Sequence, residues 1–234
     1  MKIIISPSKT MDMQKNNYLI DKELLFHKEH KKVLASLKKL TKKELGKGLS
    51  IKENLLDKTY NDINSFSGAS TSHAFPSYTG LVYKNLDKAS YKEEEYSYIT
   101  DYIRILDALY GVLEPGTLVK PYRLDMKTKI GLNLYKHWNI DRYFNGETII
   151  NLASTEFSSM LHIDMTNISF LQKKDNKYIN QATYSKMARG KFLDYLIKNK
   201  ITSVKKMKKF NSDNYQFNEP LSTEFNLVFT RKKF

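Results

Sequence analysis

The sequence predicts a mixed α/β (α+β) fold in a single compact domain spanning residues 1–234. Short apolar runs rich in β-branched residues alternate irregularly with segments of helical periodicity. With 234 residues and 41% hydrophobic side chains, the chain can bury one substantial core. No linker, repeat or change of composition marks a second domain, and the irregular order of elements does not fit a Rossmann fold or a TIM barrel.

The N-terminal half is expected to begin with a buried strand that ends in a Pro turn, and to continue with helices. Asp21 is the expected N-cap of the first helix, and the second begins with a capping box formed by Thr41 and Glu44. The expected bounds are 2–6 for the strand, 21–40 for the first helix, 41 to the GKG at 46–48 for the second, and 50–63 for the third. A short extended piece follows at 81–83.

The rest of the chain is expected to mix long helices with strands. Ile99, Ile103, Leu106 and Tyr110 recur at helical spacing, which predicts a helix ending before Gly111 as its C-terminal cap. The expected helices cover 91–110, 134–144 and 185–199, and the expected strands cover 147–152, 163–170, 178–184 and 225–229. The second and third of these strands flank a turn at 173–177.

Composition excludes several classes of function. The chain has no cysteine, so it has no disulfide, thiolate metal site, cysteine nucleophile or thiol-based sensor. No signal peptide or membrane-spanning run is evident, so we expect a cytoplasmic protein with no membrane partner. No dinucleotide-binding or Walker motif is present, and no cofactor is expected. Glu23, His27 and His30 have metal-like helical spacing but no fourth ligand, so no metal site is expected.

Positive charge is concentrated in the C-terminal half. The net charge is +14, of which residues 1–117 contribute +3 and residues 118–234 contribute +11. Residues 173–209 alone carry 12 basic and 2 acidic side chains. Such a distribution favours a polyanionic partner, usually nucleic acid. The alternative is a solvated lysine surface, because lysine outnumbers arginine 34 to 5 and the excess can reflect genomic bias.

The first strand leads into SPSK, which places Ser6 and Lys9 at the end of a sheet. This matches the S-x-x-K pattern in which a serine nucleophile is paired with a lysine base. In those enzymes the serine opens a helix, whereas here it follows a strand and Pro7 stiffens the turn. A strand-end anion contact is therefore favoured over a catalytic pair, with a purely structural turn as the alternative.

Arg123 stands out because arginine is rare in this chain. It follows Tyr122 in a stiff passage bounded by prolines, YGVLEPGTLVKPYRLDM (110–126). A planar guanidinium is useful where a phosphate or carboxylate is bound by two parallel hydrogen bonds. A buried ion pair with Asp125 or Glu156 explains the arginine equally well.

Two further passages carry candidate site residues. INLASTEF (150–157) ends a strand with Ser154 and Glu156, and Glu156 is either a salt-bridge partner, a general base or a metal ligand. In YSKMARGKF (184–192), Lys186 and Arg189 share one helix face. Gly190 costs about 1 kcal/mol inside a helix, which the close approach of another backbone or a ligand would explain.

The order of these passages resembles the YaaA family, the bacterial peroxide-stress proteins. The matching blocks are ISPSKTM, GLVY (80–83), LYGVLEPGTLVKPYRLDM (109–126), LYKHW (134–138), INLASTEF, the ARG of YSKMARGKF, and FNSDNY (210–215). The resemblance implies a cytoplasmic, DNA-binding protein that helps cells withstand hydrogen peroxide and is linked with DNA repair and limitation of free iron. It also implies a family-specific α/β fold with a basic cleft and a helix-hairpin-helix motif. No enzymatic activity follows from it.

The candidate for the hairpin is the helical pair at 41–63. Gly46 and Gly48 would let backbone N–H groups approach a phosphate, and Lys47 would add positive charge. Such a contact ignores base identity, so binding should be salt-sensitive. Two core helices joined by an ordinary glycine turn are the alternative.

The leading hypothesis is a non-enzymatic, largely sequence-independent DNA-binding protein of the peroxide stress response. Its phosphate-binding residues are expected to be Lys9, Arg123, Lys186, Arg189, Gly46, Lys47 and Gly48. The alternative is an enzyme or small-anion receptor, such as a metal-assisted nuclease, whose pocket combines Ser6, Lys9, Arg123, Glu156 and Arg189. Tyr122 and Ser154 would also line that pocket.

Overall fold

β1 (Lys2–Ile5) lies inside the central sheet of the computed structural model, which describes residues 1–232. Its three isoleucines are at most 1% exposed. β1 pairs in parallel with β3 (Ile103–Asp107) on one side and with β6 (Ile149–Asn151) on the other. Apolar β-branched residues without polar alternation are typical of a parallel strand that is covered on both faces.

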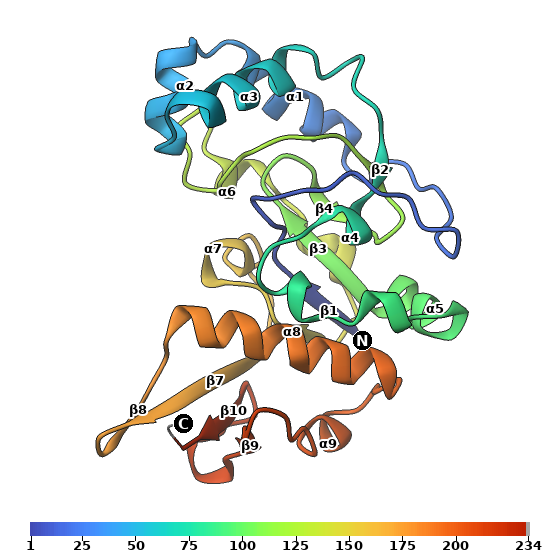
Figure 1. Cartoon of the computed structure of the whole chain (residues 1–234), viewed down its shortest axis with the longest axis vertical. Helices are drawn as coiled ribbons and strands as arrows, with labels where there is room; N and C mark the ends of the chain where they lie inside the picture. The colour runs from blue at the N-terminus through green and yellow to red at the C-terminus, as the bar shows by residue number, and fades with distance from the viewer. Residues whose placement is uncertain (233–234) are drawn as a thin grey trace.

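Within the described residues, eight strands form one mostly parallel sheet, which confirms the predicted α/β class (Figure 1). Their order is β4-β3-β1-β6-β7-β10-β9, and β8 pairs with β7. The remaining strands of this sheet are β4 (Gly111–Leu113), β7 (Thr166–Lys174), β8 (Lys177–Ile179), β9 (Gln216–Phe217) and β10 (Asn226–Arg231). Only β4, β8 and β9 run antiparallel to their partners. A separate ladder joins β2 (Ser72–His73) and β5 (Leu118–Val119).

The helices alternate irregularly with these strands along the described chain. The α-helices are α1 (His27–Lys38), α2 (Lys42–Leu49), α3 (Glu53–Asn64), α4 (Ala74–Ser77), α5 (Glu93–Tyr102), α6 (Leu134–His137), α7 (Thr155–Ser158), α8 (Ala182–Lys198) and α9 (Val204–Met207). The 3₁₀ turns are η1 (Tyr83–Asn85), η2 (Lys88–Ser90), η3 (Asp141–Phe144) and η4 (Glu219–Leu221). In Figure 1, α1–α3 gather at one end and α8 lies along β7.

An aromatic cluster joins α8 to the C-terminal strands. Phe170 on β7 lies 5.7 Å from Phe192 on α8 and 5.5 Å from Phe229 on β10, measured between ring centroids. Phe210 and Tyr215 complete the cluster, and all five side chains are at most 2% exposed. Aromatic pairs at these separations stabilise beyond their burial. The cluster holds α8 firmly against the sheet.

Several expected elements are confirmed with small shifts. The strand expected at 147–152 is β6, and the hairpin expected around 173–177 is formed by β7 and β8. The last strand is β10. The strand expected at 178–184 is shorter, because β8 ends at Ile179 and α8 already begins at Ala182.

The helix expected over 91–110 is wrong in its second half. α5 ends at Tyr102, and Ile103–Asp107 is the fully buried strand β3. Because every residue of β3 is buried, its apolar pattern cannot separate a buried helix from a parallel strand. Gly111 therefore starts β4 instead of capping a helix, with a positive φ of 80°.

The second helix does not end at the GKG. The capping box is confirmed, since the Thr41 hydroxyl accepts from the Glu44 N–H at 3.3 Å and the Glu44 carboxylate accepts from the Thr41 N–H at 2.8 Å. α2 continues to Leu49, and Ser50 ends it in the left-handed region with φ 53°. The next helix, α3, then begins at Glu53 rather than at Ser50.

Three other expectations differ from the structure. α1 begins at His27, so Asp21 is not its N-cap, and Asp21 Oδ1 instead lies 2.7 Å from His73 Nε2. The helix expected over 134–144 is divided into α6 and η3 by a short segment. That segment contains the buried Trp138, whose indole N–H donates to the Ala108 carbonyl at 3.0 Å. Residues 81–83 form a turn leading into η1.

Candidate functional site

The candidate site lies where β1 and β6 end. The two strands are parallel neighbours, so Ser6 after β1 and Ser154 after β6 emerge at the same edge of the sheet. In the sheet, β3 lies on one side of β1, and β6, which comes later in the chain, lies on the other side. Such a reversal of strand order leaves a crevice at the carboxyl ends of the strands, where α/β proteins commonly bind ligands.

A cavity of about 600 Å³ occupies this crevice, and we call it the strand-end cavity. It is lined by Ser6, Pro7, Ser8, Lys9, Thr10, Gly80, Leu81, Val82, Tyr83, Tyr122, Arg123, Leu124, Asp125, Leu152, Ser154, Thr155, Glu156, Phe157, Lys186 and Arg189. The structure thus brings together all eight expected pocket residues outside the GKG segment. They come from four separate passages of the chain.

The two serines form a link between the ends of the strands. Ser6 Oγ accepts a hydrogen bond from the Ser154 N–H at 2.8 Å and donates to Ser154 Oγ at 3.3 Å. The Tyr83 hydroxyl donates to the Ser6 carbonyl at 2.9 Å. Lys9 Nζ binds Asp125 at 2.7 Å, so it is not hydrogen-bonded to Ser6 as a serine–lysine catalytic pair would require. The geometry therefore disfavours the catalytic pair, and the choice between an anion contact and a structural turn stays open.

Among residues 1–232, Arg123 has no carboxylate partner. The expected alternative was an ion pair with Asp125 or Glu156, but Asp125 binds Lys9, and Glu156 Oε1 accepts from the Met126 N–H at 3.0 Å. The only hydrogen bond from the Arg123 guanidinium to a described residue is a long one of 3.5 Å to the Lys9 carbonyl. Its Nε is buried without an acceptor. A buried donor without an acceptor costs free energy unless a ligand satisfies it.

Arg189, which lines the same cavity from α8, repeats this arrangement. Its guanidinium has no ion pair or hydrogen bond with any residue of 1–232, and its Nε is also buried. Burial lowers the pKa of Arg189 from its ordinary value, although an arginine remains protonated at neutral pH. Lys186, one turn earlier on α8, is exposed at the rim. Both cations are available to an anion.

Gly190 explains how α8 reaches the cavity wall. A Cβ atom at this position would lie 2.3 Å from the Val82 carbonyl oxygen and 2.6 Å from Asn85 Cβ. The helix therefore packs directly on the turn that leads into η1. This close backbone approach is the explanation expected for a glycine inside the helix.

Tyr122 forms part of the cavity wall, and a buried carboxylate fixes its orientation. Its hydroxyl donates to Asp107, which also accepts from the Tyr78 hydroxyl at 2.9 Å. The backbone N–H groups of Leu109 and Tyr110 bind the other carboxylate oxygen. Burial raises the pKa of Asp107 above its ordinary value. Sequence reasoning missed this network, because it placed Asp107 inside a helix.

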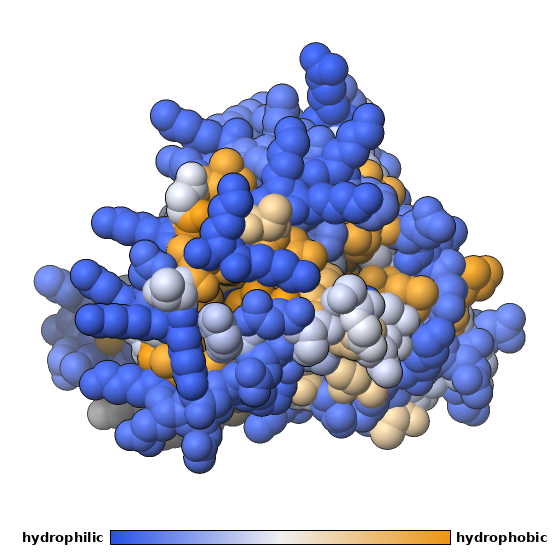
Figure 2. Space-filling view, turned by 90° about the horizontal axis from the view of Figure 1, so that it is seen from above, coloured by the Kyte–Doolittle hydropathy of each residue, from blue (hydrophilic) through white to orange (hydrophobic). Residues whose placement is uncertain are grey.

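The GKG segment lies elsewhere, on α2. A Cβ atom on Gly46 would lie 2.9 Å from a methyl carbon of Leu56 on α3, and one on Gly48 would lie 3.3 Å from Thr128. Close packing thus accounts for both glycines, and the DNA contact of Gly46, Lys47 and Gly48 stays a prediction. Figure 2 views this end of the molecule and shows hydrophilic side chains over most of the face, with hydrophobic areas between them.

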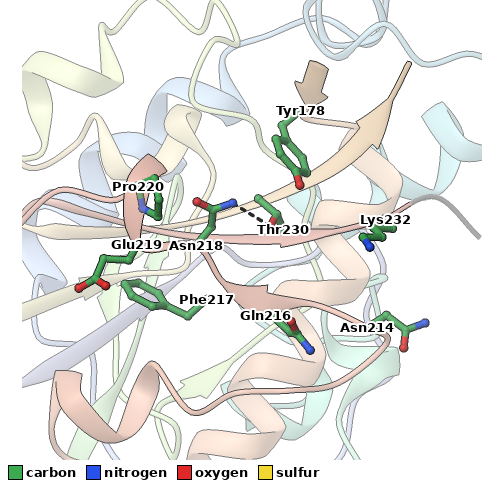
Figure 3. A pocket seen from close by; sticks show the side chains of 9 residues that line it. All are labelled: Tyr178, Asn214, Gln216, Phe217, Asn218, Glu219, Pro220, Thr230 and Lys232. Carbon is green, nitrogen blue, oxygen red and sulfur yellow. Dashed lines mark hydrogen bonds between the residues drawn. The ribbon is translucent and has the colours of Figure 1, made fainter. Parts of the chain in front are cut away.

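A second cavity, of about 710 Å³, lies beside the C-terminal strands and contains none of the expected site residues (Figure 3). We call it the C-terminal cavity. Its lining residues are Tyr178, Asn214, Gln216, Phe217, Asn218, Glu219, Pro220, Thr230 and Lys232. The Asn218 side chain spans to Thr230 at 3.1 Å and also accepts from the Leu221 N–H. Its one lysine and one glutamate leave no net charge.

The described residues offer no donor set for the metal-assisted version of the alternative. Within 1–232, no group of three or more His, Asp or Glu side chains could hold a metal ion. Glu156, the expected ligand, is bound to a backbone N–H instead. In the same part of the chain, no helix is long and apolar enough to cross a membrane.

Comparisons with known proteins agree with the resemblance found in the motifs. The sequence model of the peroxide stress protein YaaA family matches residues 1–221. A UPF0246 protein of Fusobacterium nucleatum is 37% identical over 99% of each chain. UPF0246 proteins of Clostridium beijerinckii and Saccharophagus degradans are 35% and 32% identical, over 98% or more of each chain. With matches of this extent, the chain belongs to the peroxide stress protein YaaA family.

Proposed function

We propose that this protein is a non-enzymatic DNA-binding protein that contacts phosphates largely without regard to sequence. The protein would act in the cytoplasm, where its contact with DNA would protect the nucleic acid during peroxide stress. The expected links with repair and with free iron stay predictions. The absence of cysteine fits protection better than thiol-based sensing of the oxidant.

The observation that carries the proposal is a pair of guanidinium groups whose buried Nε atoms have no acceptor among the described residues. Arg123 and Arg189 reach one cavity from different elements, and neither has a carboxylate partner among residues 1–232. Arginine with free donors in a fixed planar arrangement suits phosphate oxygens. Lys186 at the rim adds a further contact that does not read bases.

The long-range charge supports the same partner. Some lysines of the basic stretch 173–209 are used in ion pairs, such as Lys191 with Asp213 at 2.6 Å and Lys198 with Asp87 at 2.8 Å. Several others, including Lys173 and Lys205, are exposed. A net charge of +14 would steer a polyanion toward the protein and make its association dependent on salt.

The test is a double substitution, Lys186→Ala with Arg189→Ala, assayed by fluorescence anisotropy on duplexes of unrelated sequence. We expect the affinity to fall at least tenfold for every duplex, because each charge-assisted contact contributes about 1.5–3 kcal/mol. The slope of log K against log salt should become shallower by about 2.

The matched control is Lys136→Ala with Arg142→Ala, which removes the same two types of charge from exposed positions outside the cavity. This control should bind duplex DNA much more tightly than the cavity variant. Equal losses in the two variants would show that only total charge matters, and unchanged affinity in the cavity variant would refute the proposed site.

A further inference from the structure

The charged side chains of the strand-end cavity do not balance. Four are basic, namely Lys9, Arg123, Lys186 and Arg189, and two are acidic, namely Asp125 and Glu156. Lys9 and Asp125 neutralise each other at 2.7 Å. The cavity therefore carries an excess of two positive charges. Arg123 and Arg189 are half-buried and have no counterion among the described residues, which is unfavourable.

A dianion matches this excess better than a monoanion. A phosphodiester inside a DNA strand carries one negative charge, whereas a phosphomonoester carries nearly two at pH 7, because its second pKa is about 6. A monoester also has three terminal oxygens. These are enough to accept from both unsatisfied guanidinium groups, Arg123 and Arg189, at the same time.

The size and walls of the cavity also fit a single nucleotide. Its volume of about 600 Å³ lies within the range of small-ligand pockets, about 300–1,000 Å³, so it can enclose one nucleotide, whereas a duplex could present only its backbone phosphates at the opening. Apolar side chains, including Leu81, Leu124, Leu152 and Phe157, line it beside the charged groups. They offer a surface for a sugar or base, and the serine link also lines the cavity where the strands end.

We propose that the strand-end cavity binds a phosphomonoester, the group carried by a phosphorylated DNA end or by a free nucleotide. The DNA-end source rests on the proposed function, and the free-nucleotide source does not. The rim lysine Lys186 would then contact the adjoining strand, and the two arginines would bind the terminal phosphate.

The first experiment is calorimetric titration with the four 2′-deoxynucleoside 5′-monophosphates. We expect binding at least tenfold tighter than that of the matching nucleosides or of 3′,5′-cyclic monophosphates, which are diesters with one charge. The affinity should fall as the pH drops below about 6, where the monoester becomes a monoanion. Arg123→Lys keeps the charge but not the planar donors, and it should weaken binding at least tenfold, as should Arg189→Ala.

The control variant is Arg142→Ala, an exposed arginine outside the cavity, which should bind like the unaltered protein. Thermal melting of each variant separates lost binding from lost folding. If Arg123→Lys does not fold, Arg189→Ala alone decides the outcome. Equal affinity for monophosphates and cyclic monophosphates would overturn the proposal, as would unchanged affinity in a folded Arg189→Ala protein.

The second experiment distinguishes the two sources with hairpin DNA bearing a 5′-phosphate, the same hairpin with a 5′-hydroxyl, and a closed dumbbell without ends. Tighter binding of the phosphorylated hairpin supports the DNA end, and monophosphate binding without that preference supports a free nucleotide. If the phosphorylated hairpin is not preferred and no monophosphate binds, while the dumbbell still binds, this proposal is overturned and the proposed function stands. Failure of all three DNAs to bind refutes the proposed function, and the monophosphate titration still decides the cavity.

Discussion

Two regions of the molecule enclose arginine side chains, and they treat them in opposite ways. On β3, the Arg104 guanidinium donates to the Tyr143 hydroxyl at 2.6 Å and to the Thr100 and Ile103 carbonyls, and it lies 3.4 Å from Glu114. In the strand-end cavity, the Arg189 guanidinium has no hydrogen bond or ion pair with any of residues 1–232. The partners of a buried charge, rather than its burial, distinguish a structural arginine from one that can bind a ligand.

The sharpest test of this contrast is Arg104→Ala against Arg189→Ala. Removing Arg104 leaves Glu114 and two carbonyls without their donor, so we expect the free energy of unfolding to fall by about 3 kcal/mol. Removing Arg189 breaks no hydrogen bond to a described residue and relieves a desolvated charge, so stability should change by less than about 1 kcal/mol. Urea denaturation at equal protein concentration measures both.

The outcome that contradicts the contrast is an equal loss of stability in the two variants. Arg189 would then have a structural role. Duplex binding provides the second readout, because Arg104→Ala should retain its affinity wherever the protein is folded, while Arg189→Ala should not.

A smaller effect is expected from Gly190→Ala, which acts on the wall of the cavity rather than on its charge. The added methyl would overlap the Val82 carbonyl at 2.3 Å, so α8 must move away from the turn before η1. Overpacking of this kind costs about 2 kcal/mol, and it would displace Arg189 on the same helix. Both stability and phosphate binding should therefore decrease.

Gly68→Ala is the matched control. The nearest atom to its added methyl would be the Ser65 carbonyl oxygen at 3.9 Å, which is an ordinary contact. Its thermal midpoint and its affinity should stay close to those of the unaltered protein. A Gly190→Ala variant that also behaves normally would show that α8 can shift freely, and that the close approach does not position Arg189.

The sequence predicted which residues gather around the strand-end cavity better than it predicted the bounds of the helices and strands. Ser6 and Ser154 were recognisable because each follows a short apolar strand, and parallel strands end at a common edge. Arg123 was recognisable because arginine is rare in a lysine-rich chain, and Arg189 because it shares a helix face with Lys186. These signals depend on residue type and on strand ends, so they survive errors in the bounds of helices.

The errors arose where burial is complete or where one contact overrides local preference. Ile103 and Leu106 fit a helical period only because every residue of β3 is buried, and so Asp107 at its end was missed. Gly46 indicates a turn by propensity, yet its lack of a side chain lets α2 approach Leu56. That Arg123 has no carboxylate partner among the described residues is a property of tertiary packing that no local pattern contains.

The smallest effects should come from the ion pair at the rim, where Lys9 and Asp125 are 56% and 19% exposed. Lys9→Ala should cost less than about 1 kcal/mol of stability, as exposed pairs usually do. The same substitution should weaken anion binding by more than it lowers stability, because an unpaired Asp125 would then repel the ligand. Asp125→Asn should do the reverse and tighten binding about fivefold, which corresponds to about 1 kcal/mol.

The double variant Lys9→Ala with Asp125→Asn closes this cycle and should bind nearly as the unaltered protein does, because the net charge of the cavity is restored. Duplex anisotropy and monophosphate titration at one fixed salt concentration measure all four proteins. If Asp125→Asn weakens binding, the carboxylate holds Lys9 in position for the ligand rather than competing with it. Lys9 would then be a cation that binds the ligand while its own carboxylate partner holds it in place, and having a partner would no longer mark a cation as purely structural.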